Sequence, residues 1–214
     1  YDESRLRMLG VPYVISSSGK TVPEDTGAYP KSALVTTDTE IESQNMIDYL
    51  CSCGHKRIAF ITSRDEGLGR CHLNGYKRAL EKNGLEYDEK LIIRLKPAKR
   101  IYTIENGYNC TCELLKSGVD FSCIYAISDT LAVGACRAII DSGKRVPEDY
   151  CVAGADGQDI AEYYHPSITT LKYPRVETAQ QSVRTLFDMI DRKKVVKRQI
   201  LGGTLIERES TRKL

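Results

Sequence analysis

Short β-rich runs alternate with helical segments along the whole chain, and this alternation limits the possible folds more than any other feature. The predicted strands span Pro12–Ser16, Arg57–Thr62, Leu91–Leu95, Cys123–Ile127, Cys151–Ala155 and Thr204–Arg208. Most are nearly continuous apolar runs, as expected of strands that are covered on both faces. This pattern is typical of parallel βα units. The sequence therefore predicts an α/β fold.

The segments between these strands carry apolar residues three or four positions apart, which is the spacing of one face of a helix. They predict helices around Ile41–Leu50, Leu73–Leu80 and Leu131–Ile140, and a longer helix over Val176–Arg192. Before the first strand, Ser4–Leu9 adds only a helix fragment. Because residues 1–37 alone would form too small a core, we expect preceding βα units to be missing from this lobe.

Composition and charge favour a soluble protein without a broad surface for nucleic acid. The 31 lysines and arginines almost balance 29 acids, giving a formal charge of +2 and no chain-wide field that attracts DNA. No apolar run reaches the roughly 18 residues that a membrane span needs, and the first residues lack the apolar stretch of a signal peptide. We therefore expect a cytoplasmic protein with no membrane partner.

The cysteines indicate neither a disulfide framework nor a metal site. Eight cysteines are scattered through apolar and helical segments, which fits reduced thiols in a cytoplasm. The stretch Cys51-Ser52-Cys53-Gly54-His55 looks like half of a zinc site, but no second Cys/His pair stands at zinc-like spacing. We expect cysteines at helix ends and in the core, and no bound metal.

Motifs for catalysis are also missing. The sequence contains no dinucleotide-binding, Walker-type, nucleophile-elbow or zinc-protease motif. Gly67-Leu68-Gly69-Arg70 could cradle an anion at a helix N-terminus, or it could be a flexible turn between a strand and a helix. Nothing in the spacing marks a nucleophile with its base. The sequence therefore predicts a protein that is not an enzyme and needs no cofactor.

Several blocks of the sequence resemble the LacI/GalR family of bacterial transcription regulators. Gly54–Ile61 is followed by Gly75–Leu80, as in that family. A second block contains Ser128-Asp129, Val146-Pro147-Glu148-Asp149, Val152-Ala153-Gly154-Ala155-Asp156 and Pro166-Ser167-Ile168-Thr169-Thr170-Leu171, and the tail Leu205–Thr211 is also similar. The blocks keep the family's order and spacing from about Gly10 onward.

This resemblance implies two Rossmann-like lobes of the type I periplasmic-binding-protein class, with an incomplete N-terminal lobe and a ligand cleft between the lobes. Crossovers near Thr37, Leu171 and Val196 would assign residues 1–37 and 172–195 to the N-terminal lobe. Residues 38–171 and 196–214 would form the C-terminal lobe. Family members are homodimers that bind operator DNA through an N-terminal helix-turn-helix domain, which is not in this sequence.

The resemblance also implies a set of ligand-binding residues. Asp156 matches an acid that accepts hydrogen bonds from ligand hydroxyls, although it could instead cap the helix that begins near Gln158. Tyr102 matches an aromatic that stacks on the ligand, with an exposed loop tyrosine as the alternative. Both residues suit a sugar.

Other positions depart from the family pattern. His72 stands where an arginine often grips the ligand, and it could equally be a packed helix residue; Arg70 could reach the ligand in its place. Ser128 replaces a frequent asparagine, and Ser17 replaces an acid found in some members. Asp129 opens a helix, where an acid is more often a cap than a ligand contact.

These observations favour the ligand-sensing part of a LacI/GalR-type regulator, in which a small polar effector such as a sugar controls operator binding. The alternative is a periplasmic or secreted sugar-binding protein of an uptake system. The eight cysteines, Gly54-His55 and the run Ile206–Ser210 argue against that alternative.

Overall fold

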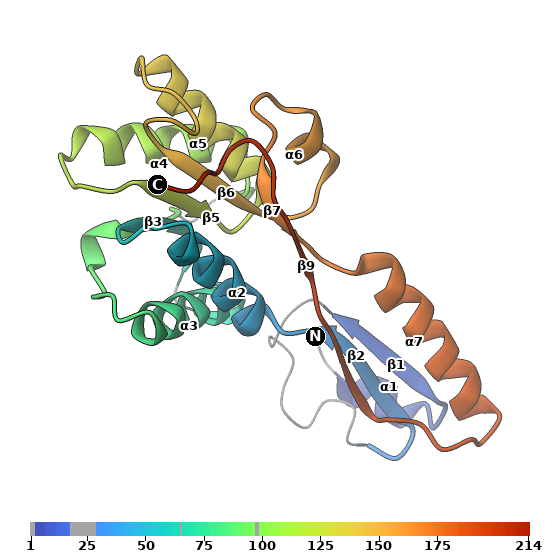
Figure 1. Ribbon diagram of the computed structural model, residues 1–214. Helices are drawn as coiled ribbons and strands as arrows, with labels where there is room; N and C mark the ends of the chain where they lie inside the picture. The colour runs from blue at the N-terminus through green and yellow to red at the C-terminus, as the bar shows by residue number, and fades with distance from the viewer. Residues whose placement is uncertain (1–2, 18–28, 65, 97–98) are drawn as a thin grey trace. The chain divides into compact units, whose positions relative to one another are not determined.

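The computed structural model describes residues 3–17, 29–64, 66–96 and 99–214 (Figure 1). The chain divides into two compact units. The first unit contains Tyr1–Thr39 and Tyr173–Gly203, and the second contains Glu40–Lys172 and Thr204–Leu214.

The first unit is built on a parallel sheet with the strand order β1-β2-β8. These strands are β1 (Tyr13–Ser17), β2 (Ser32–Thr37) and β8 (Arg198–Leu201). The unit also contains α1 (Glu3–Met8) and α7 (Arg175–Ile190), and α7 packs along β1 and β2 (Figure 1). The sequence placed the last boundary near Val196, whereas β8 lies beyond that point and pairs with β2.

The second unit is built on a six-stranded sheet with the order β4-β3-β5-β6-β7-β9. Its strands are β3 (Ile58–Thr62), β4 (Ile92–Arg94), β5 (Cys123–Ala126), β6 (Cys151–Asp156), β7 (Thr169–Lys172) and β9 (Thr204–Ile206). Every pair is parallel except β7 with β9, which is antiparallel. The two sheets, which are parallel apart from the β7–β9 pair, confirm the predicted α/β class.

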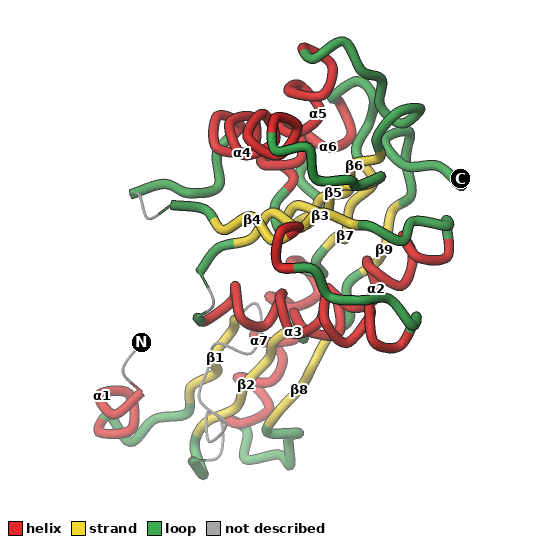
Figure 2. The backbone as a smooth tube through the Cα atoms, turned by 90° about the vertical axis from the view of Figure 1, so that its left-hand side faces the viewer, coloured by secondary structure: helices red, strands yellow, loops and turns green. Residues whose placement is uncertain are grey.

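Helices cover both faces of this second sheet. They are α2 (Thr39–Ser52), α3 (Gly67–Lys82), α4 (Ile104–Lys116), α5 (Asp129–Asp141) and the short α6 (Asp159–Tyr163), with a 3₁₀ turn at Glu89–Leu91. Figures 1 and 2 show α2 and α3 on one face, with α4 and α5 on the other. Because both faces are covered, β3 and β5 are buried along their full length.

Aromatic stacking fills the centre of the second unit. The Phe60 ring stacks on Tyr76 and Tyr125, with ring centroids 5.0 Å and 5.3 Å away. All three side chains are almost fully buried, and the Tyr76 hydroxyl donates a hydrogen bond of 2.8 Å to the carbonyl oxygen of Ile58. The hydroxyl is therefore satisfied within the core, and this cluster ties α3 to the sheet.

Two glycines allow α4 and α5 to pack closely together. A Cβ atom at Gly107 would lie 2.1 Å from the Leu131 carbonyl oxygen, and one at Gly134 would lie 2.1 Å from the Ile104 carbonyl oxygen. Since real Cβ atoms do not approach backbone oxygens so closely, both positions require glycine. The contact fixes α5, whose first residues follow the carboxyl end of β5.

None of the eight cysteines forms a disulfide bond. Within the described ranges, no group of three or more His, Cys, Asp and Glu side chains is arranged to hold a metal ion. No helix in the described part of the chain is long and apolar enough to cross a membrane.

Candidate functional site

Polar side chains gather where the parallel strands of the second sheet end. The carboxyl ends of neighbouring parallel strands meet at one edge of a sheet, which is where ligands bind in open α/β folds. Asp156 is the last residue of β6, and Ser128 follows β5 by two positions. Since β5 and β6 are adjacent, the sheet brings these two predicted residues to the same edge.

Asp156 has an unusual backbone conformation. Its φ of 107° lies in the left-handed region that non-glycine residues rarely adopt. Its carboxylate is half-buried and accepts a hydrogen bond of 2.9 Å from the side-chain amide of Gln158. The N-cap of α6 is Gln158, and its side chain makes no capping bond. A strained backbone at the end of a central strand is typical of a functional position.

Asp129 lies buried next to Asp156 and holds two neighbouring segments by hydrogen bonds. It is the first residue of α5 and is completely buried. Its carboxylate accepts hydrogen bonds from the Thr170 hydroxyl at 2.5 Å and from the Gln158 backbone amide at 2.7 Å. Burial, together with the nearby Asp156 charge, raises the pKa of Asp129 to about 6. The sequence suggested a cap at this position, but the carboxylate reaches two other segments of the chain.

His72 lies on the buried face of α3, with only 5% of the residue exposed. Its backbone carbonyl accepts a hydrogen bond of 3.0 Å from the Ser43 hydroxyl. The ring atom Nδ1 is buried and has no hydrogen-bond partner in the structure. Burial lowers the pKa of His72 to about 4, so the ring is neutral at physiological pH. A neutral ring can donate one hydrogen bond and accept another, but it lacks the planar fork of donors that arginine offers.

The other predicted residues lie on different segments and differ in their exposure. Tyr102 precedes α4 and is 44% exposed, so its ring is accessible at the end of the β4 connection. Arg70 is exposed in the first turns of α3, whereas Ser128 is buried. Ser17 is half-buried at the carboxyl end of β1 and belongs to the first unit. The second unit therefore holds all of the predicted ligand residues except Ser17.

Two glycines in the first turn of α3 have structural roles. A Cβ atom at Gly69 would lie 2.1 Å from the Arg64 carbonyl oxygen, so this position needs glycine for close approach. Gly67, with a φ of 54°, begins the helix. This geometry accounts for both glycines as a strand-to-helix turn.

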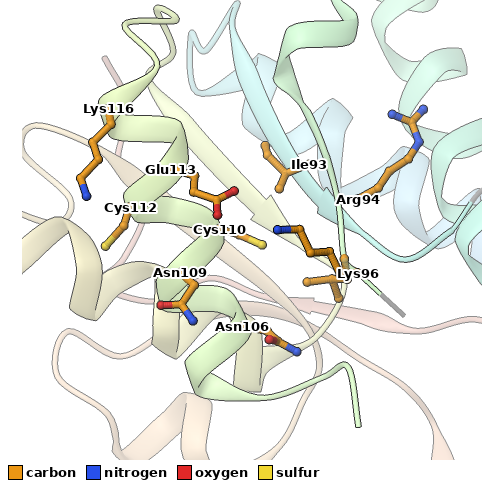
Figure 3. Close-up of a pocket in the computed structure, with 10 residues that line it drawn as sticks. Ile93, Arg94, Lys96, Asn106, Asn109, Cys110, Cys112, Glu113 and Lys116 are labelled. Carbon is orange, nitrogen blue, oxygen red and sulfur yellow. The ribbon is translucent and has the colours of Figure 1, made fainter. Parts of the chain in front are cut away.

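A pocket of about 370 Å³ lies elsewhere in the second unit, between β4 and α4 (Figure 3). Lys96, Glu113 and Cys110 line it together with Asn106 and Asn109. None of the predicted ligand residues lines this pocket. It is therefore separate from the strand-end site.

The sequence matches the family of periplasmic binding protein-like domains over residues 47–211. The HTH-type transcriptional regulator MalR of Clostridium butyricum is 40% identical to this chain over 146 residues. This match covers 68% of the chain and 42% of the relative. The regulator CelR of Thermobifida fusca is 34% identical over 182 residues, which cover 85% of the chain and 51% of the relative.

Solved structures agree with this assignment. The structure of a CelR–cellobiose complex matches with a TM-score of 0.80 and 32% identity, covering 98% of this chain and 62% of that one. This chain is a LacI-family effector-binding domain. A LacI-family regulator from Enterococcus faecium with bound ribose has a TM-score of 0.80 and 28% identity, covering 99% of this chain and 75% of that one.

The effector-binding domain spans about half the length of the regulators it matches, at 42% and 51% of MalR and CelR. Both relatives are named as regulators, which agrees with the prediction of a protein that is not an enzyme. The comparisons thus confirm the predicted family and fold.

Proposed function

We propose that this effector-binding domain senses a sugar or sugar derivative and belongs to a regulator that binds operator DNA through an N-terminal domain. The names of MalR and CelR, both HTH-type transcriptional regulators, support the DNA-binding role. The bound cellobiose and ribose in similar structures support a sugar-like effector. The same relatives favour a cytoplasmic regulator over the alternative of a secreted solute-binding protein.

The observation that carries the proposal is the strained Asp156 at the carboxyl end of β6. A carboxylate can accept hydrogen bonds from two adjacent sugar hydroxyls, and such charge-assisted bonds are stronger than those between neutral groups. The ring of Tyr102 is accessible and could pack against the C–H face of a sugar. Within the second unit, we assign ligand contacts to Asp156, Tyr102, His72, Ser128 and Arg70.

Sugar binding would regulate DNA binding through a shift between two states of the dimer. An effector changes this equilibrium only by the difference between its affinities for the two states. We further propose a homodimer, as the resemblance to the LacI/GalR family implies.

A thermal-shift screen tests the effector class. The chain is screened with cellobiose, ribose, other mono- and disaccharides, sugar phosphates, nucleosides and amino acids. A ligand at about 100 times its dissociation constant stabilises the folded state by about 2.7 kcal/mol. We expect a sugar to raise the melting temperature of the wild type, and we expect this shift to disappear in Asp156→Asn.

Asp141→Asn is the matched control, since Asp141 ends α5 and pairs with Arg137 on the protein surface. This control should keep the full ligand-induced shift. A hit from the amino acids or nucleosides, with no response to any sugar, would contradict the proposed effector class. A sugar response that survives Asp156→Asn would contradict the proposed site.

A further inference from the structure

The buried Asp129 carboxylate joins two segments that are far apart in the sequence. Its Oδ1 atom accepts the hydrogen bond from the Thr170 hydroxyl in β7, at 2.5 Å. Its Oδ2 atom accepts the hydrogen bond from the Gln158 backbone amide, which follows β6, at 2.7 Å. Because Asp129 is 0% exposed, it cannot itself reach a ligand at the protein surface.

The two residues that donate to Asp129, Thr170 and Gln158, also hold the segment that carries Asp156. The side-chain amide of Gln158 donates to Oδ2 of Asp156 at 2.9 Å. The Thr170 hydroxyl oxygen accepts a hydrogen bond of 3.3 Å from the backbone amide of Gly157. The segment 156–158 is thus attached to the Asp129 carboxylate on both sides, directly at Gln158 and through Thr170 at Gly157.

This segment has a backbone that needs such support. Asp156 has a φ of 107° and Gly157 a φ of 65°. A non-glycine residue remains in such a conformation only when its surroundings fix it. Two hydrogen bonds to one buried carboxylate provide that restraint. The carboxylate belongs to α5, which is itself held by the close contact of Gly107 and Gly134 between α4 and α5.

We infer that Asp129 is a positioning residue, which sets the affinity for the effector by holding Asp156 in the orientation that meets the ligand hydroxyls. This inference rests on the proposed function. Asp129 acts through the segment 156–158 and does not contact the effector. Removing its second acceptor oxygen should therefore weaken sugar binding only while Asp156 is present.

A double-mutant cycle tests this dependence. Asparagine at position 129 keeps one acceptor oxygen for two donors. Calorimetric titration with cellobiose and with ribose measures the resulting change in affinity. We expect Asp129→Asn to weaken binding at least tenfold in the wild-type background. In the Asp156→Asn background, the residual affinity is titrated at sugar concentrations far above those of the thermal-shift screen. There Asp129→Asn should cause no further loss of affinity, and Asp141→Asn should have no effect in either background. Equal losses in both backgrounds would overturn the inference.

Amide hydrogen exchange tests the same restraint without a ligand. In Asp129→Asn, the Gln158 amide should exchange at least tenfold faster, while Asp141→Asn leaves its rate unchanged. Thr170→Val gives an independent variant, and it should accelerate exchange at Gly157; Thr111→Val is its control, because the buried Thr111 hydroxyl has no hydrogen-bond partner. Unchanged exchange in both Asp129→Asn and Thr170→Val would overturn the inference.

The two experiments separate this inference from the proposed function. If neither sugar binds the wild type but exchange accelerates as expected, the restraint on segment 156–158 stands and the proposed sugar class fails. If a sugar binds and Asp156→Asn removes the thermal shift, but Asp129→Asn changes neither affinity nor exchange, the proposed function stands and the role of Asp129 fails.

Discussion

Acidification should change stability in opposite directions through Asp129 and His72. Burial raises the pKa of Asp129 from 3.8 to about 6 and lowers that of His72 from 6.5 to about 4. A raised carboxyl pKa means that folding favours the protonated form, so Asp129 adds stability as the pH falls from 6 towards 4. A lowered histidine pKa means that folding favours the neutral form. The contribution of His72 to the free energy of unfolding therefore decreases over nearly the same pH range.

The magnitude follows from the size of the shifts. Each is slightly more than two pKa units, which corresponds to about 3 kcal/mol, of which about 2 to 3 kcal/mol develops between pH 7 and pH 4. In the wild type the two contributions nearly cancel. Relative to the wild type, Asp129→Asn should therefore lose about 2 to 3 kcal/mol of unfolding free energy on acidification, and His72→Gln should gain a similar amount.

Urea unfolding followed by far-ultraviolet circular dichroism at pH 7, 6, 5 and 4 measures these differences. Comparing each variant with the wild type at the same pH removes the contribution of the other titrating groups. In the double variant Asp129→Asn/His72→Gln, the free energy of unfolding should change with pH in the same way as in the wild type. Differences that do not change with pH in either single variant would refute the reasoning.

Two further substitutions test the packing of the second unit by urea unfolding. Phe60→Ala removes the ring that stacks between two tyrosines in the core, and it should cost about 3 to 5 kcal/mol; a loss below about 1 kcal/mol would contradict the packing. Gly134→Ala would place a Cβ 2.1 Å from the Ile104 carbonyl oxygen and should cost about 1 to 3 kcal/mol. Gly202→Ala, where no atom lies within 4 Å of the added Cβ, should change stability little, and equal losses in the two glycine variants would contradict the proposed contact.

Much of the βα alternation could be predicted from the sequence because apolar runs mark buried strands. The helix α4 was not predicted, although its buried residues Gly107, Thr111 and Leu114 have helical spacing. Two of these three are not apolar, so a search for apolar periodicity does not detect the helix. Strand β8 was not predicted for a related reason, since its residues alternate between exposed and half-buried and form no apolar run.

The candidate site was only partly predictable. Resemblance to the family pointed to Asp156 at the end of a strand, and the structure places it at the carboxyl end of β6. The support from Asp129 could not be predicted, because its partner Thr170 lies 41 positions away and only the pairing of β6 with β7 brings it close. For His72 the sequence left open a ligand contact or a packed helix residue. Its burial with an unpartnered Nδ1 atom is compatible with both.

Chemical-shift mapping by nuclear magnetic resonance tests most directly whether a sugar binds where the parallel strands of the second sheet end. The ¹⁵N-labelled chain is titrated to saturation with the sugar that gives the largest thermal shift, or with cellobiose if none does. We expect the largest chemical-shift changes at Ser128 and at residues 156–158, with smaller ones near Tyr102 and His72. Shifts confined to the pocket between β4 and α4, or no shifts with any sugar, would contradict it.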